Sequence, residues 1–232
     1  MIIEDPVIVT FTLFSTKPIY ITLWTLIGFL GNNVLFSLRV LVQWIASERE
    51  KRSVAPRVFW WISLIAALIV ILYTLQRSMD PRFADRPSAL PFLIGLLISL
   101  VPYVRNLMLS YNVARKWHIV SYFFAAIVFG FCSVLLFRID VPLVRSSWFI
   151  LGMTGSLLWY TRFLWQWLYA ERKKRSDFPM SFWYASFFGV SLNMVYSLMM
   201  GDIVFILGFM FNIIPITRNI ILIKRHQRVR VV

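Results

Sequence analysis

Residues 35–63 read LFSLRVLVQWIASEREKRSVAPRVFWWIS and return at residues 158–186 as LWYTRFLWQWLYAERKKRSDFPMSFWYAS. The register is constant, because each matched residue returns 123 positions later. The matched pairs include Arg39 and Arg162, Gln43 and Gln166, Glu48 and Glu171, Pro56 and Pro179, and Trp60 and Trp183. A long repeat of this kind indicates that the chain holds two copies of one structural unit.

The repeat continues into a further apolar stretch of each half. Four residues of the first half recur there in the second half. The spacing between each residue and its copy is ten residues smaller than in the first segment, because the first half has a longer loop around residues 77–87. The pairs are Gly95 and Gly208, Pro102 and Pro215, Arg105 and Arg218, and Asn106 and Asn219. The repeated unit therefore contains three apolar segments, and we expect each of them to form a helix.

The composition is that of a membrane protein. The 232 residues are 59% hydrophobic and 15% charged, well outside the range of soluble domains. A net charge of +14 would also suit a nucleic-acid-binding protein, but such proteins gather basic residues on a water-facing surface, whereas here they lie between apolar stretches. We therefore expect membrane lipid as a partner and no nucleic acid. The single cysteine, Cys132, excludes an intrachain disulfide and a cysteine metal site.

Seven nearly uncharged stretches of about 20 residues are long enough to cross a hydrocarbon core ~30 Å thick. They run from Ile21 to Ile45, Arg57 to Gln76, Ala89 to Tyr111, Trp117 to Phe137, Ser147 to Tyr169, Met180 to Met200 and Ile203 to Lys224. With the N-terminus outside, fourteen Lys and Arg residues fall in cytoplasmic segments and six in outer segments. This asymmetry predicts an N-out, C-in orientation.

Two three-helix units joined directly would lie in opposite orientations, because three is an odd number. A linker helix restores the parallel orientation and predicts an all-α integral membrane fold with a 3+1+3 parallel tandem repeat. The predicted parts are an N-terminal segment (1–20), a first three-helix repeat (21–111), the linker helix (112–138), a second repeat (139–224) and a basic cytoplasmic tail (225–232). Parallel-repeat carriers such as the SWEET sugar transporters place their substrate path between the halves.

The pattern R-x-x-x-Q-W-x-x-x-E-R-x-x-R-S-x-x-P-x-x-F-W starts at Arg39 and again at Arg162. With it the chain resembles the family named after the N-terminal domain of some lipid-A-disaccharide synthases, over both three-helix repeats. The resemblance implies a unit related to PQ-loop and SWEET repeats. For a two-copy member it also implies flipping of an undecaprenyl-phosphate amino sugar in lipid A modification. The glycosyltransferase activity in the family's name belongs to a separate soluble domain, so we do not expect it here.

Four arginines lie inside predicted helices, namely Arg39, Arg105, Arg162 and Arg218. Arg39 precedes Glu48 by nine residues, which places it ~13 Å below the cytoplasmic helix end. An arginine at such a depth costs roughly 2.5 to 3.5 kcal/mol, so it should face the bundle interior or a wet cavity. Repeat symmetry predicts that the four guanidinium groups meet between the units. Since guanidinium is permanently charged and matches phosphate oxygens in a bidentate way, we expect them to bind a phosphate.

An amide accompanies each of these arginines, one turn later in the first helix of each unit and directly after it in the third. The amides are Gln43, Gln166, Asn106 and Asn219, and we expect them to orient the headgroup of the ligand. Two carboxylates, Glu48 and Glu171, lie at cytoplasmic helix ends, where they could form an ion pair or a gate. The predicted pocket therefore keeps surplus positive charge, and its guest should be an anion.

Structural roles remain open for the same residues. Arg39 can reach Glu48 or Glu50 by extending along its own helix. The segment around Glu48 and its counterpart Glu171 can be only a charged cytoplasmic turn. The glycines Gly28, Gly31, Gly152 and Gly155 resemble contact points between helices, which is a weak motif.

The sequence offers little for enzyme chemistry. Neither His118 nor His226 has a carboxylate or cysteine at metal-ligand spacing, and no glycine-rich phosphate loop is present. The aspartates Asp80, Asp85, Asp140 and Asp202 are scattered over the predicted outer side, without the paired spacing that acid–base work on a sugar needs. We therefore expect no metal, no cofactor and no enzyme activity.

The leading hypothesis is a carrier of the bacterial inner membrane that moves a polyprenyl-phosphate-linked amino sugar, or a related anionic phospholipid, by alternating access. A second hypothesis is a non-catalytic membrane subunit that docks a glycosyltransferase of the lipid A pathway through its basic loops. A third is a SWEET-like carrier of small sugars, which four buried cations disfavour because such sugars are neutral.

Overall fold

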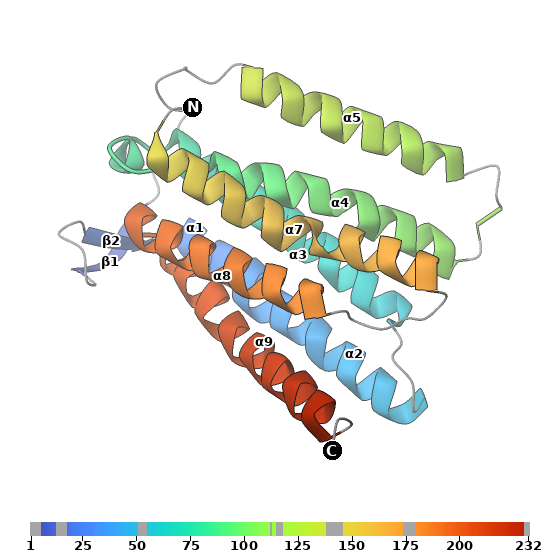
Figure 1. Cartoon of the computed structure of the whole chain (residues 1–232). Helices are drawn as coiled ribbons and strands as arrows, with labels where there is room; N and C mark the ends of the chain where they lie inside the picture. The colour runs from blue at the N-terminus through green and yellow to red at the C-terminus, as the bar shows by residue number, and fades with distance from the viewer. Residues whose placement is uncertain are drawn as a thin grey trace.

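A computed structural model describes residues 6–12, 18–50, 55–111, 113–114, 118–137, 146–173 and 180–229. This part of the chain is a bundle of long helices with a short β-hairpin at one end (Figure 1). In chain order the elements are β1 (Val7–Thr12), β2 (Pro18–Thr22), α1 (Leu23–Phe29), η1 (Leu30–Leu35), α2 (Phe36–Glu50), α3 (Arg57–Met79), η2 (Pro81–Phe83), α4 (Leu90–Ser110), α5 (His118–Phe137), α7 (Ser147–Lys173), α8 (Met180–Met200) and α9 (Ile203–Val229). The segment η1 is a π-helix and η2 is a short 3-10 helix.

The helical membrane class is confirmed. Among the described residues, five helical stretches are long and apolar enough to cross a membrane, namely Leu23–Glu50, Arg57–Met79, Leu90–Ser110, Ile119–Phe137 and Ile203–Ile221. Helices α7 and α8 occupy the other two predicted positions, with 27 and 21 residues. That α7 and α8 also span the membrane, and that the chain runs N-out, stay predictions.

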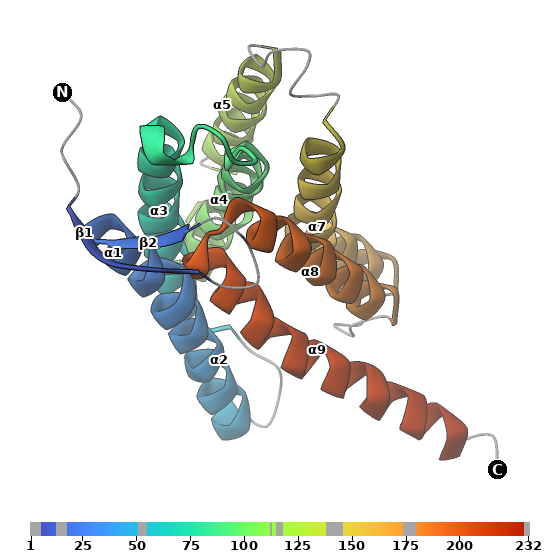
Figure 2. The same ribbon diagram turned by 90° about the vertical axis from the view of Figure 1, so that its left-hand side faces the viewer.

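The hairpin adds β-structure to an N-terminal segment for which the sequence predicts no strand. Strands β1 (VIVTFT) and β2 (PIYIT) pair antiparallel, with Thr10 opposite Tyr20 and Phe11 opposite Ile19. Both strands are rich in β-branched and aromatic residues, which favour strands. The side chain of Ile19 anchors the hairpin, since it is buried. Figure 2 shows the hairpin beside α1, and we call this end of the bundle the hairpin end.

The main core joins the two halves of the chain. We call the stretch from α1 to α4 unit 1 and the stretch from α7 to α9 unit 2. Phe92 of α4 is fully buried, and its ring lies 5.4 Å from that of Tyr196, 4.4 Å from Phe205 and 5.4 Å from Phe209, measured between centroids. In addition, α4 packs on α7 and α9 packs on α1 and η1. The third helix of each unit thus contacts the first helix of the other.

Helix α5 lies at the edge of the bundle, against α4 (Figure 1). Its contacts with α4 include a small cluster of Ile94, Val128 and Cys132. The thiol of Cys132 is buried and free. Most of the other large side chains of α5 are exposed, as expected for a helix that faces lipid.

Two glycine–tyrosine contacts recur in the units. A side chain at Gly28 would lie 2.6 Å from the ring of Tyr73, and one at Gly152 would lie 2.7 Å from the ring of Tyr196. These tyrosines, 123 positions apart in the sequence, each reach across to the other unit. The Tyr73 hydroxyl donates to Asp202 at 2.9 Å, and the Tyr196 hydroxyl donates to the carbonyl of Ser88. Each tyrosine therefore ties the second helix of its own unit to the start of the third helix of the other.

Candidate functional site

Arg39 on α2 lies half-buried among neutral partners. Its guanidinium donates to the Tyr103 hydroxyl at 2.9 Å and to the Ser63 hydroxyl at 3.2 Å. It also lies over the ring of Phe36 at 4.4 Å and near that of Phe59 at 5.6 Å. Within the described residues no carboxylate pairs with it, and its buried Nε has no hydrogen-bond partner. The structure therefore contradicts the alternative in which Arg39 forms an ion pair with Glu48 or Glu50.

Arg162 on α7 occupies the corresponding place in unit 2. It is buried, donates to the carbonyl of Trp159, and lies 3.4 Å from the centroid of the Trp159 ring. Trp159 corresponds to Phe36, since both precede their arginine by three residues. Each arginine thus lies over an aromatic ring of its own helix, which is a favourable cation–π arrangement.

The two arginines share one electrostatic environment. Arg39 and Tyr160 lie close enough to Arg162 to contribute to its electrostatic environment. The hydroxyl of Tyr103 completes the group, because it contacts Arg39 directly and also interacts with Arg162. We call Arg39, Arg162, Tyr103 and Tyr160 the arginine pair site. It is assembled from α2, α4 and α7, and so from both units.

Sequence reasoning missed the two tyrosines and Ser63. Tyr103 follows the helix-internal Pro102, and Tyr160 precedes Arg162 by two residues, but neither belongs to the repeated pattern. The ring of Tyr160 packs directly against Gly95 of α4. A Cβ atom at position 95 would clash with that ring. A tyrosine close to a mid-helix arginine was the available signal, although the packing of Tyr160 against Gly95 could not be read from the sequence.

The other predicted site residues lie elsewhere or are only partly described. Arg105 is half-buried on α4, and because it follows Tyr103 by two residues it points to another side of the helix. Arg218 is exposed on α9. The amide of Asn106 donates to the Pro102 carbonyl of its own helix at 2.7 Å. That Arg105 and Arg218 join Arg39 and Arg162 in one site stays a prediction.

Four further predicted residues complete the set. Gln43 is half-buried one turn beyond Arg39, and Asn219 is half-buried on α9. Glu48 is exposed and accepts a hydrogen bond from Trp44 at 3.2 Å. The side chains of Gln166 and Glu171 lie outside the described residues. Their roles in orienting a headgroup or forming a gate stay predictions.

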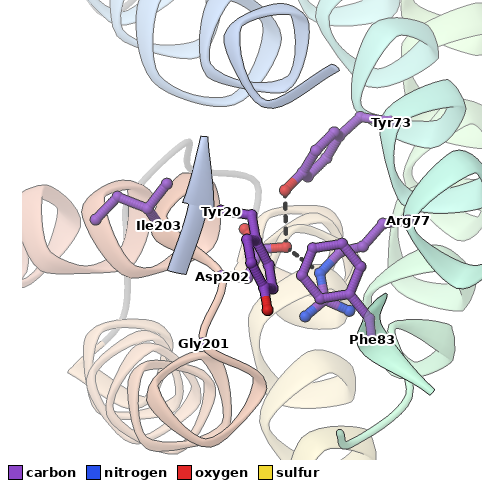
Figure 3. Close-up of a pocket in the computed structure, with 7 residues that line it drawn as sticks. All are labelled: Tyr20, Tyr73, Arg77, Phe83, Gly201, Asp202 and Ile203. Atoms are coloured by element: carbon purple, nitrogen blue, oxygen red, sulfur yellow. Dashed lines mark hydrogen bonds and ion pairs between the residues drawn. The ribbon is translucent and has the colours of Figure 1, made fainter. Parts of the chain in front are cut away.

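A second charged cluster lies at the hairpin end (Figure 3). The buried carboxylate of Asp202 lies 2.6 Å from Nε of Arg77 and accepts the hydrogen bond from Tyr73. Arg77 also donates to the carbonyl of Met200 at 2.7 Å and lies over the ring of Phe83. We call Arg77, Asp202 and Tyr73 the hairpin-end clasp. It connects α3 of unit 1 to the turn before α9 of unit 2.

Neighbouring residues enclose the clasp. Together with Tyr20, Phe83, Gly201 and Ile203 it lines a small pocket (Figure 3). Arg86 lies beside it, buried, and donates to the carbonyl of Pro18 in the hairpin at 2.6 Å. Burial lowers the pKa of Arg86, with a further contribution from the charge of Arg77. The loop between α3 and α4 thus fastens the hairpin to both units.

The clasp was also missed by sequence reasoning. Asp202 was grouped with scattered outer aspartates, yet the structure buries this carboxylate against a cation from the other unit. The available local signal was an aspartate just before a helix. Indeed, Asp202 caps α9, accepting from the backbone amides of Val204 at 3.0 Å and Phe205 at 3.3 Å.

Metal chemistry has no support in the part of the chain that the structure describes. No group of three or more His, Cys, Asp or Glu side chains there could hold a metal ion.

Comparison with known proteins agrees with the repeat. The Lipid A Biosynthesis N-terminal domain matches the chain twice, at residues 27–108 and 151–221. The chain is 29% identical over 215 residues to a lipid-A-disaccharide synthase of Chlamydia pneumoniae, covering 87% of this chain and 34% of that protein. It is 30% identical over 227 residues to that of Chlamydia trachomatis serovar D, covering 90% of this chain and 35% of the relative.

The chain spans about a third of the length of these curated relatives. No solved structure matches it significantly. The two family matches fall on unit 1 and unit 2, and they leave out the hairpin and α5. The chain therefore belongs to the Lipid A Biosynthesis N-terminal domain family, of which it contains two copies.

Proposed function

We propose that the chain is a carrier that moves a phosphate-bearing lipid across the membrane, and that the phosphate binds at the arginine pair site. The observation that supports this proposal is that Arg39 and Arg162, at equivalent positions of the two units, lie within electrostatic range of each other. The described partners of Arg39 are all neutral, so its charge is not balanced within its own unit.

The energetic argument favours an anionic guest. Each arginine inside a membrane costs roughly 2.5 to 3.5 kcal/mol on insertion scales, and placing two of them together adds repulsion. A bound phosphate offsets both costs, because it accepts bidentate hydrogen bonds from guanidinium groups. The hydroxyls of Tyr103 and Tyr160 would supply further donors to phosphate oxygens. A neutral sugar would leave the repulsion in place.

The family supports the pathway of the cargo. The chain belongs to a lipid A biosynthesis family, and the relatives are lipid-A-disaccharide synthases. A polyprenyl-phosphate-linked amino sugar for lipid A modification fits this context, with the lipid tail in the bilayer and the sugar near the amides of Gln43 and Gln166. In this proposal the protein lies in the bacterial inner membrane and is a transporter rather than an enzyme.

The mechanism that we propose is alternating access between two parallel units. The hairpin-end clasp and the hydrogen bond from Tyr196 to the carbonyl of Ser88 hold the units together at one end of the bundle. The arginine pair site would then open toward the other end. Breaking the clasp and rocking unit 1 against unit 2 would expose the site on the opposite side.

The test uses purified protein in proteoliposomes that contain a fluorescent undecaprenyl-phosphate sugar. We expect Arg39→Gln and Arg162→Gln each to lower transbilayer transfer at least tenfold, which corresponds to about 1.4 kcal/mol. Arg218→Gln is the matched control, because Arg218 is an exposed arginine of the same chain. Transfer that is equal in all three variants would refute the proposal.

A second candidate is a membrane subunit that docks a glycosyltransferase. It is favoured by the relatives, since the matched region makes up about a third of proteins called lipid-A-disaccharide synthase. In this case a complex should survive Arg39→Gln but dissociate when Arg49 and Arg172 are neutralised. Copurification of the two variants with the transferase distinguishes the candidates.

A further inference from the structure

The first helices of the two units differ in one respect. In unit 1 the helix is interrupted by the π-helix η1 at Leu30–Leu35, between α1 and α2. In unit 2 the corresponding helix, α7, runs from Ser147 to Lys173 as a continuous α-helix. A π-helical turn accommodates an extra residue inside an α-helix and often lies at a functional site.

The contacts of four glycines locate a change of register. A Cβ atom at Gly31 would meet Ile69 and Val70 on the second helix of unit 1. A Cβ atom at Gly155 would meet Leu192 and Asn193, which are the equivalent residues of unit 2. Those neighbours are 123 positions apart, but the glycines themselves are 124 apart, as are Gly28 and Gly152. From Leu35 onward, including Arg39 and Arg162, the spacing is 123 again.

Unit 1 therefore has one more residue than unit 2 between the glycine contacts and the arginine. This extra residue falls within η1. In a regular α-helix of 3.6 residues per turn, one added residue would rotate everything after it by about 100°. Arg39 would then point away from Tyr103 and α7.

We infer that η1 is a register device, which absorbs the extra residue and thereby keeps Arg39 directed at Tyr103 and Ser63 in the arginine pair site. The first-helix glycines stay packed on α3, and the arginine stays in the site, although the chain between them is longer. The π-turn is in this sense a positioning element for the arginine pair site, and the inference holds whatever the protein transports.

The longer segment also brings two amides to the other unit. Asn32 and Asn33 both donate to the carbonyl of Val204 on α9, at 2.9 and 3.0 Å. Asn32 fits there because α9 has a glycine at that point, and a side chain at Gly208 would lie 2.2 Å from its amide nitrogen. Unit 2 has Ser156 and Leu157 in the corresponding place. The register device therefore also fixes η1 to α9.

Two single-residue deletions test the inference. Val34 is the exposed residue of η1 that follows the two asparagines, so its deletion shortens the π-turn and keeps both amides. Leu157 is an exposed residue of α7 that lies between Gly155 and Arg162, where no π-turn can absorb a loss. The readout is the thermal unfolding midpoint in detergent. The second readout is the thermodynamic coupling between Arg39→Gln and Tyr103→Phe in each background.

We expect deletion of Val34 to lower the midpoint by only a few degrees and to retain the coupling of Arg39 with Tyr103. Deletion of Leu157 should lower the midpoint several-fold more, or prevent folding, because it rotates Arg162 out of the site. The inference is overturned if deletion of Val34 is as damaging as deletion of Leu157. It is equally overturned if both are tolerated, or if the coupling is lost when Val34 is removed.

Discussion

Buried arginines occur at two levels of this bundle, and they differ in how their charge is balanced. At the hairpin end, Arg77 has a buried carboxylate at 2.6 Å from the other unit. At the arginine pair site, the partners of Arg39 among the described residues are hydroxyls and aromatic rings, and Arg162 lies within electrostatic range. The balanced pair connects the two units. The described partners of Arg39 are neutral, and our proposal therefore places the anionic ligand at the arginine pair site.

The largest effect on stability should come from breaking the balanced pair. Replacing Asp202 with Asn removes the charge but keeps an amide oxygen that can still cap α9. Arg77 would then be buried without a counter-charge, which destabilises by about 3–5 kcal/mol. Thermal unfolding of D202N in detergent measures the loss.

At the arginine pair site we expect that removing an arginine does not lower stability. Replacing Arg39 with Gln removes a repulsive charge from Arg162, so R39Q should unfold at the same temperature as the parent or higher. A loss as large as that of D202N would mean that Arg39 is a structural residue, and the comparison between the two levels would fail.

A smaller effect is expected where the first and second helices pack. Gly28→Ala would press a methyl group against the ring of Tyr73 at 2.6 Å, and Gly152→Ala would do the same to the ring of Tyr196 at 2.7 Å. Overpacking of this kind costs about 1–3 kcal/mol. Gly130→Ala on α5 is the control, because nothing lies within 4 Å of a side chain added there. Equal unfolding midpoints in all three variants would contradict the packing that we describe.

The smallest effect concerns the loop after α3. Arg82 donates to both carboxylate oxygens of Asp80, through Nε at 2.9 and 3.0 Å. Burial alone raises the pKa of Asp80, but the hydrogen bonds and charge of Arg82 outweigh it and hold the pKa below its usual value. The ionised carboxylate therefore adds stability above pH ~4, and this contribution is lost as the pH falls through the lowered pKa.

Asp80→Asn should accordingly cost ~0.5–1 kcal/mol at neutral pH, the size of a partly exposed ion pair. The difference from the parent should shrink when unfolding is measured at decreasing pH below 4. A difference that grows on acidification would have the wrong sign for this ion pair.

Much of the fold could be predicted from the sequence, because apolar length and an internal repeat are local signals. The repeat alone locates the helices and places Arg39 and Arg162 at equivalent positions of the two units. The hairpin was missed, although its β-branched residues are visible, because two short strands give a weaker signal than a long apolar helix. The π-turn was missed because a single extra residue leaves the apolar pattern intact.

The clasp and the tyrosines of the site were harder to predict. Arg77 and Asp202 are far apart in the sequence, and nothing local to either residue marks them as partners. The ring of Tyr160 fits against α4 because Gly95 leaves room for it, and such a fit depends on how the two units pack. Repeat symmetry also groups Arg105 and Arg218 with the other two arginines, and that grouping stays a prediction. The exposure of Arg218 on α9 could only come from the structure.

The most direct test of the central claim is ligand-induced thermal stabilisation. Undecaprenyl phosphate should raise the unfolding midpoint of the parent protein, whereas undecaprenol, which lacks the phosphate, should not. In protein carrying both Arg39→Gln and Arg162→Gln, the phosphate lipid should have no more effect than the alcohol. Equal stabilisation of the parent and the double variant by undecaprenyl phosphate would contradict the claim that the arginine pair holds the anion.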